Sequence, residues 1–287
     1  MRKILLLVIM GLLSGTLFSQ ELNNSEGAEG NKSYFNGKVN YTTNSLYFGR
    51  SDSIVTPFSG INFTYNHKSG IFLDGTLNFF PNRTVSILDM GSISAGYNYN
   101  LFNDKLSGSI GYSRYFYSQY STQVGSVIKG TLSLGFYLDL NIVQLSMGAY
   151  LNHGDKKDVK INPGISRGFE IKKFLGSSLK ITPTATLFAG TQNLMGVYIL
   201  QRPGKIKNIY NKKGKHGSTN TTGKTTTIST NYSKFNFLSL DVSLPLNYSI
   251  KAYTFNFTAT YSIPFNVQDG EFTHNPFFMD FSIGVKF

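Results

Sequence analysis

The feature that most constrains this chain is an alternation of apolar and small polar residues that recurs from about residue 37 to the last residue. In the segment 126–139, for example, Leu132, Leu134 and Phe136 alternate with Ser133 and Gly135. Successive side chains of a β-strand point to opposite faces, so such a segment has one apolar and one polar face. The pattern predicts an all-β protein built from two-faced strands.

Turn signals divide this pattern into about twelve strands. We expect them at about 37–50, 56–65, 71–80, 91–101, 106–117, 126–139, 142–152, 157–166, 178–192, 234–246, 252–264 and 276–287. Most have roughly 9 to 14 residues, which suits a tilted strand that crosses a bilayer and exceeds the usual length in a soluble sheet. The boundaries are least defined in the first strand and in 157–192, where Pro163 and Pro183 interrupt the pattern.

The connections between these segments are of two kinds. Short turns are expected at 66–70, 102–105, 139–141 and 247–251, and longer polar connections at 81–89, 118–125, 193–233 and 266–275. This asymmetry is typical of barrels with short periplasmic turns and longer extracellular loops. We therefore expect an antiparallel transmembrane β-barrel of about twelve strands with both termini in the periplasm. A soluble barrel or sandwich would explain the alternation, but explains the long strands and the aromatic residues near strand ends less well.

The N-terminal residues have the pattern of an export signal. Arg2 and Lys3 precede an apolar run, and small and polar residues follow it, so 1–19 reads as a signal peptide cleaved after Ser19. The polar segment 20–33 then reads as a flexible periplasmic lead-in to the barrel at 34–287. The chain has no cysteine, which excludes disulfides, Cys-based metal sites and a lipidated cysteine. The fold itself must anchor the protein.

Taken with the terminal sequence GVKF, these segments make the chain resemble the outer-membrane β-barrel superfamily, porin-like in the broad sense. The resemblance covers 34–287 and implies a location in the bacterial outer membrane, surrounded by lipid and lipopolysaccharide. It also implies that the barrel assembly machinery recognises the C-terminal strand, with Phe287 as the assembly signal. The resemblance selects no single family, and a fold alone does not define a function.

The chain is basic, with 27 Lys and Arg against 15 Asp and Glu and a formal charge of +12. Seven of these cations lie in the expected long extracellular loop, about 193–233, which contains no acidic residue: Arg202, Lys205, Lys207, Lys212, Lys213, Lys215 and Lys224. Such a loop attracts lipopolysaccharide phosphates or anionic solutes. The Gly-, Ser-, Thr- and Asn-rich sequence of the loop argues against a fixed site and favours a solvated loop. Nucleic acid is not expected, because an exported protein meets other anions first.

The polar faces of the strands predict a polar interior. Its candidate lumen-lining charges are Asp74, Asp139, Asp241, Asp280, Lys160 and Lys180. A barrel of about twelve strands lies between small barrels filled by side chains and wide porins with an aqueous channel. These charges could therefore line a narrow pore, or pair with one another and close it.

An enzymatic site is not expected. His67 and Ser69 match the His-x-Ser spacing of some lipid-modifying barrels, but Gly70 follows where those enzymes have Asn, and the segment reads as a hairpin turn. No two histidines are spaced as a metal pair, and we expect no metal or cofactor.

The favoured function is a narrow pore for small solutes. The alternative is a closed structural or accessory barrel that binds a surface or secretion complex through its extracellular loops. A lipid-modifying enzyme ranks third.

Overall fold

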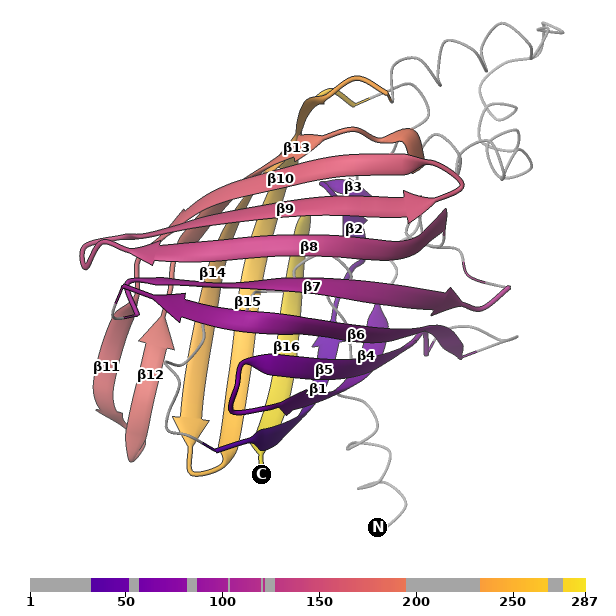
Figure 1. Cartoon of the computed structure of the whole chain (residues 1–287). Helices are drawn as coiled ribbons and strands as arrows, with labels where there is room; N and C mark the ends of the chain where they lie inside the picture. The colour runs from indigo at the N-terminus through magenta and orange to yellow at the C-terminus, as the bar shows by residue number, and fades with distance from the viewer. Residues whose placement is uncertain are drawn as a thin grey trace, which may run out of the picture.

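The computed structural model describes residues 32–51, 57–81, 87–102, 104–119, 121, 127–194, 233–267 and 276–287. Most of these residues belong to one large antiparallel sheet that is closed on itself (Figure 1). Its strands are β1 (Tyr34–Thr42), β4 (Phe58–Asn66), β5 (Ile71–Phe79), β6 (Leu88–Leu101), β7 (Leu106–Tyr117), β8 (Ile128–Asp139), β9 (Gln144–Gly154), β10 (Lys157–Ser166), β11 (Phe169–Phe174), β12 (Ser177–Ile181), β13 (Thr184–Gly190), β14 (Asn236–Ile250), β15 (Tyr253–Pro264) and β16 (Phe277–Lys286).

Two pairings complete the ring. The first strand pairs with the last one, from Asn36 opposite Lys286 to Thr42 opposite Asp280. The pairing of β14 with β15 closes the sheet into a ring, and β11 pairs with β12 alone among the described residues. The sequence prediction of a closed antiparallel β-barrel is confirmed.

Twelve strand positions make up this ring, because two strands are interrupted. Thr182 and Pro183 separate β12 from β13, yet both pieces keep one register along β14, with Ile181 opposite Leu246 and Thr184 opposite Ser243. Likewise, β11 continues β10 after a break at 167–168. A proline has no N–H to donate to a ladder, which explains the break at Pro183. The predicted count of about twelve is therefore correct, and the irregular segment after Ser166 forms the β11–β12 hairpin.

Short turns lie at the end of the barrel where β1 begins and β16 ends, which we call the turn end; the opposite end is the loop end (Figure 1). Turn residues there take positive φ, including Gly70 at 97°, Asn141 at 65° and Lys251 at 53°. The turn predicted at 247–251 begins later than expected: residues 247–250 belong to β14, and the turn is Lys251–Ala252. That the turn end faces the periplasm stays a prediction.

The first predicted strand was too long. β1 ends at Thr42, and the following residues leave the wall and form the short pair β2 (Leu46–Tyr47) and β3 (Arg50–Ser51). Asn44 interrupts the alternation here, and three consecutive apolar residues, 46–48, cannot all face one side of a strand. We call 43–51 the inner segment, because its residues 47–50 are all buried.

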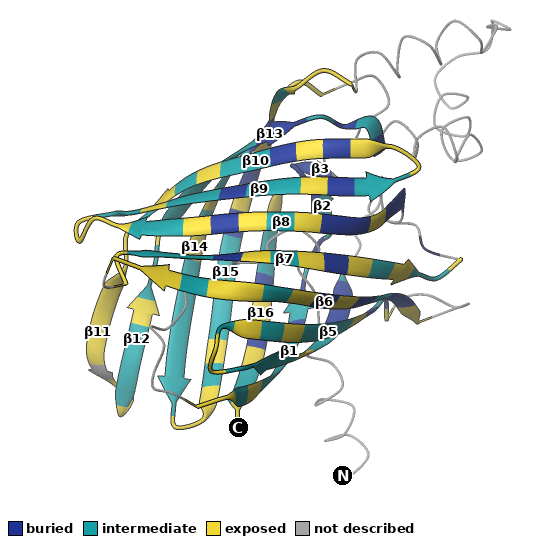
Figure 2. Ribbon diagram, viewed as in Figure 1, coloured by how far each residue is buried: buried dark blue, intermediate teal, exposed yellow. Residues whose placement is uncertain are grey.

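The two faces of the wall differ in chemistry. Along β7 and β8, for example, exposed residues alternate with buried or intermediate ones (Figure 2). The exposed positions are largely apolar, such as Phe63 at 66% and Ile93 at 63% exposure, whereas the intervening positions hold buried Ser, Thr and Asn, such as Ser94 and Asn152. No helix within the described ranges is long and apolar enough to cross a membrane.

Candidate functional site

The candidate site is the lumen, whose wall carries a continuous row of polar side chains. Across six neighbouring strands the paired residues of this row are Asp74, Ser94, Ser113, Thr131, Asn152 and Asp158. The row is linked by side chains: the Ser94 hydroxyl donates to Ser113 at 2.9 Å, and the Thr131 hydroxyl donates to Asn152 at 2.8 Å. Buried hydroxyls and amides need such partners, so the interior is built as a polar surface.

Asp74 is the centre of a hydrogen-bonded cluster on β4 and β5. Its carboxylate accepts hydrogen bonds from the hydroxyl of Thr64 at 2.8 Å, from the hydroxyl of Thr76 at 3.3 Å and from the amide of Asn62. Asn62 also donates to Thr76 at 2.9 Å. The structure thus places this predicted lumen charge on the inner face, where neutral donors hold it.

Two more of the predicted lumen carboxylates lie on the inner face of β14 and β16. Asp241 accepts a hydrogen bond from Ser262 at 2.5 Å, and Asp280 accepts one from Thr42 at 2.6 Å. Asp280 is only 8% exposed. Since Thr42 is the last residue of β1, this second bond also joins the first and last strands near the start of the inner segment.

The inner segment is fixed in the barrel by Arg50, which is 1% exposed. Its guanidinium donates to the carbonyl oxygens of Phe48 at 2.8 Å, Leu238 at 3.0 Å and Phe265 at 2.7 Å. Leu238 lies on β14, and Phe265 directly follows β15. A guanidinium presents several donors in a fixed plane, so this residue ties the segment to two strands of the wall.

Aromatic residues of the inner segment reach a second part of the wall. The ammonium of Lys160 on β10 lies 4.3 Å from the ring centroids of both Tyr47 and Phe48 and donates to the Tyr47 hydroxyl. Phe48 also contacts Phe188 on β13, with ring centroids 5.2 Å apart. Lys160 is 3% exposed. Lys160 therefore lies on the inner face, as predicted, but its ammonium contacts the inner segment. The inner segment narrows the lumen beside β10, β13 and β14.

Buried carboxylates also organise the loop end. Asp158 is fully buried and accepts hydrogen bonds from the Thr191 hydroxyl at 2.7 Å and from the backbone N–H groups of Asn193 at 2.6 Å and Leu194 at 3.0 Å. This carboxylate fixes the chain where it leaves β13. Sequence reasoning did not single out Asp158, because an aspartate beside a loop carries no distinctive pattern.

Two predicted lumen charges are exposed near the turn end. Asp139 ends β8 and accepts a hydrogen bond from the N–H of Asn141 at 2.7 Å, which stabilises the turn. Lys180 lies on β12 opposite Glu170, in the interrupted hairpin. A lumen function for both stays a prediction.

The predicted basic loop residues, Arg202, Lys205, Lys207, Lys212, Lys213, Lys215 and Lys224, lie outside the described residues. Phe287 is 75% exposed, and its N–H donates to the carbonyl oxygen of Phe35 at 2.9 Å, so the chain end is joined to β1. Its use as an assembly signal stays a prediction.

His67 and Ser69 do contact each other. The Nδ1 atom of His67 lies 2.8 Å from the Ser69 hydroxyl, in an exposed turn between β4 and β5. Gly70 has φ of 97°, and the segment forms the predicted hairpin turn. Within the described part of the chain, no group of three His, Cys, Asp or Glu residues could hold a metal ion.

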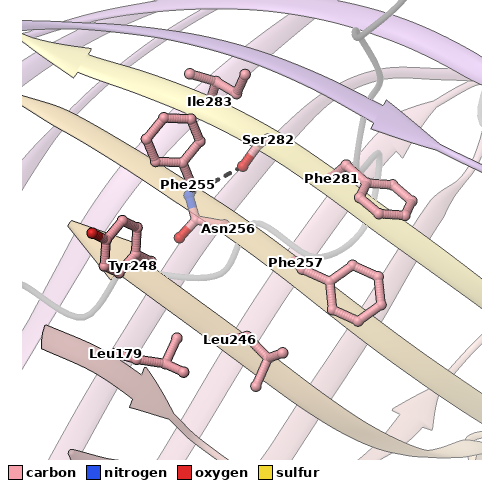
Figure 3. Close-up of a pocket in the computed structure, with 9 residues that line it drawn as sticks. All are labelled: Leu179, Leu246, Tyr248, Phe255, Asn256, Phe257, Phe281, Ser282 and Ile283. Atoms are coloured by element: carbon pink, nitrogen blue, oxygen red, sulfur yellow. Dashed lines mark hydrogen bonds between the residues drawn. The ribbon is translucent and has the colours of Figure 1, made fainter. Parts of the chain in front are cut away.

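The outer face has an apolar hollow on β12 and β14–β16 (Figure 3). It is lined by Leu179, Leu246, Tyr248, Phe255, Asn256, Phe257, Phe281, Ser282 and Ile283. Asn256 donates to the Ser282 hydroxyl at 3.1 Å, and Asn256 also accepts from Asn247 at 2.6 Å. Asn256 and Ser282 alternate along their strands with apolar side chains that face outward. The hollow therefore lies on the apolar side of the wall and is no part of the lumen.

Sequence reasoning missed the inner segment as a functional element. The signals that could have found it are the three adjacent apolar residues of 46–48 and the arginine after Gly49, which together do not fit a two-faced strand.

No protein-family model and no curated protein matches the sequence. Among solved structures, the chain is similar to a KdgM porin, with 9% identity, 88% of this chain and 98% of that chain covered, and a TM-score of 0.47. It is also similar to an outer membrane channel from Pseudomonas putida F1, with 10% identity, coverage of 90% and 96%, and a TM-score of 0.48. Likenesses at this level do not define the function of the chain.

Proposed function

We propose that this protein is inserted in the bacterial outer membrane and provides a narrow pore for small polar solutes. The observation that carries the proposal is a closed ring of strands with apolar residues outside and polar residues inside. A closed barrel satisfies every backbone hydrogen bond of its wall, which the hydrocarbon of a bilayer requires. An apolar exterior of this extent would be unfavourable in water.

The inner segment sets the width of the proposed pore. Twelve strands enclose more space than small barrels that their own side chains fill. The inner segment occupies part of this space and is held by Arg50 and Lys160. Solutes therefore pass beside 43–51, along the polar row and the carboxylates of Asp74 and Asp241 on opposite walls.

The solutes are proposed to be small and preferentially anionic. The support is the sequence of the long connection between β13 and β14, which contains eight cations and no carboxylate. If the loop end is extracellular, these charges raise the concentration of anions at the entrance. Lipopolysaccharide phosphates would compete for the same charges.

Liposome swelling tests the pore directly. Liposomes that contain the refolded mature chain are transferred into isosmotic solutions of neutral, anionic and cationic solutes of increasing size. We expect rapid swelling for the smallest solutes, a sharp decline with size, and faster entry of anions than of cations of equal size. A chain that migrates as a folded, heat-modifiable barrel but gives no swelling contradicts the pore and favours the closed accessory barrel.

The same preparation tests the enzymatic alternative. We infer that His67 and Ser69 form a turn, because they lie exposed beside Gly70 at the end where the chain enters and leaves the barrel. Lipid hydrolysis that is lost in Ser69→Ala would contradict this inference.

A further inference from the structure

A row of basic and aromatic side chains crosses the outer face of β7–β10 near the loop end. The strand registers place Arg114 opposite Gly130, Gly130 opposite His153, and His153 opposite Lys157. Neighbouring strands are about 4.8 Å apart, so the four positions form one continuous row. Arg114 and Lys157 are exposed, in contrast to the buried cations of the lumen.

The middle of the row has a defined geometry. The ring of Tyr112 stacks on His153 with an interplanar angle of 8° and centroids 5.8 Å apart, and the Tyr112 hydroxyl lies 2.8 Å from His153 Nε2. Gly130 makes this contact feasible: a Cβ there would come within 2.5 Å of both the Tyr112 hydroxyl and His153 Nε2. The Tyr112–His153 pair therefore lies directly over Gly130, between Arg114 and Lys157 in the row.

More cations lie at the edge of this row. The register of β8 and β9 shifts between Ile128 and Gly130, and Lys129 in this bulge is exposed. Lys129 donates to Asp155 at 2.6 Å, so the acidic residue of the β9–β10 turn already has a cationic partner. Lys156 follows in the same turn and is exposed. The local charge is therefore positive.

The next row toward the turn end carries no charged side chain. It consists of Tyr112, Leu132, Leu151 and Val159, which are paired across the same four strands and exposed by 38% to 48%. An apolar row beside a basic row on an outward face marks a boundary between hydrocarbon and headgroups. Anionic headgroups attract Lys and Arg at such a boundary.

We propose that Arg114, His153 and Lys157 bind the phosphate of a lipid headgroup in the leaflet at the loop end. The guanidinium offers a planar pair of donors to phosphate oxygens, the ammonium of Lys157 supplies a second charge, and the Tyr112–His153 pair supports the sugar or glycerol part of the headgroup. This inference rests on the proposed membrane insertion of the barrel, but it does not depend on whether the lumen conducts.

The test is lipid binding by the folded mature chain in neutral detergent, measured by native mass spectrometry. The probes are diphosphoryl lipid A, the same lipid without its phosphates, and inorganic phosphate. The test variant carries Arg114→Gln, His153→Gln and Lys157→Gln. The matched control carries Lys68→Gln, Lys105→Gln and Lys251→Gln, three exposed cations at the turn end.

We expect the phosphorylated lipid to bind the wild type and the control equally, and the test variant about 25-fold more weakly, since each cation near a headgroup contributes about 5-fold. The lipid without phosphates should bind all three chains equally weakly. Binding of the test variant within about 2-fold of the wild type, an equal loss in the control, or equal occupancy by inorganic phosphate would overturn the proposal. A chain that binds the lipid as expected but gives no liposome swelling would leave this proposal standing and contradict the pore.

Discussion

Arg50 combines complete burial with several hydrogen bonds to backbone carbonyl oxygens. A buried charge is tolerated only when its donors are satisfied, because desolvation is otherwise too costly. The bonds to Leu238 and Phe265 connect residues that are distant in sequence. The conformation of the inner segment therefore depends strongly on a single side chain.

Replacement of this side chain should release the inner segment while the barrel persists. In Arg50→Ala we expect the backbone amides of 46–51 to exchange hydrogen at least about 10-fold faster, because charged hydrogen bonds contribute about 1.5–3 kcal/mol each. Hydrogen exchange with mass spectrometry measures this. Arg167→Ala, which removes an exposed arginine that lies over Phe169, is the matched control and should leave the inner segment protected.

The Asp241 carboxylate should influence which ions pass. Asp241→Asn removes a negative charge from the lumen wall but keeps an acceptor for the Ser262 hydroxyl. We expect the anion-to-cation permeability ratio, measured from reversal potentials in a salt gradient, to rise about 2-fold or more. Asp139→Asn alters an exposed turn instead. An equal shift in both variants would argue against a lumen function of Asp241.

At the scale of the strands, small residues make room for large ones within the lumen. The ring of Phe72 on β5 lies over Gly96 of β6, where an added Cβ would be 2.5 Å from its Cζ atom and 2.6 Å from Cε1. Gly111 on β7 lies under the same ring, with a corresponding distance of 3.2 Å. These strands can thus carry an aromatic side chain on their inner face without spreading apart.

Gly96→Ala should therefore destabilise the barrel. We expect a loss of about 1–3 kcal/mol in the free energy of unfolding, as is typical of overpacking, measured by urea titration in detergent. Gly75→Ala is the control, because nothing lies within 4 Å of its added Cβ. That variant should be unchanged or slightly more stable; equal destabilisation of both would contradict the packing explanation.

Strands with regular alternation were predictable from sequence, and interruptions were not. Residues 106–117 and 157–166 form strands with the predicted bounds, and Pro163 lies within the second of them without ending it. The sequence predicted an irregularity at Pro183 but not that the strand continues beyond it, because the common register of β12 and β13 is set by their pairing with β14. The bulge at Lys129 and the departure of the chain after Thr42 depend on tertiary contacts that period-two patterns do not encode.

The candidate site was predictable in its chemistry and less so in its geometry. Asp74, Asp241, Asp280 and Lys160 all belong to the inner face, as alternation predicted. Their partners could not be inferred, because pairs such as Lys160 with Tyr47 are separated by more than a hundred residues along the chain.

At the scale of the whole molecule, one wall separates two environments. The outer face presents apolar side chains, and the inner face presents hydroxyls, amides and carboxylates to the lumen. The inner segment is the element that converts this polar interior into a narrow passage, because it is attached to both β10 and β14. The central claim is therefore that 43–51 sets the width of a conducting lumen.

Single-channel conductance in planar bilayers tests this claim most directly. The wild type is compared with a variant in which 46–50 are replaced by five Gly and Ser residues, after both are shown to be heat-modifiable barrels. We predict steady, small conductance steps for the wild type and larger steps for the variant, because the contacts of Tyr47, Phe48 and Arg50 are lost. Equal steps in the two proteins, or no conductance in either, would contradict the account.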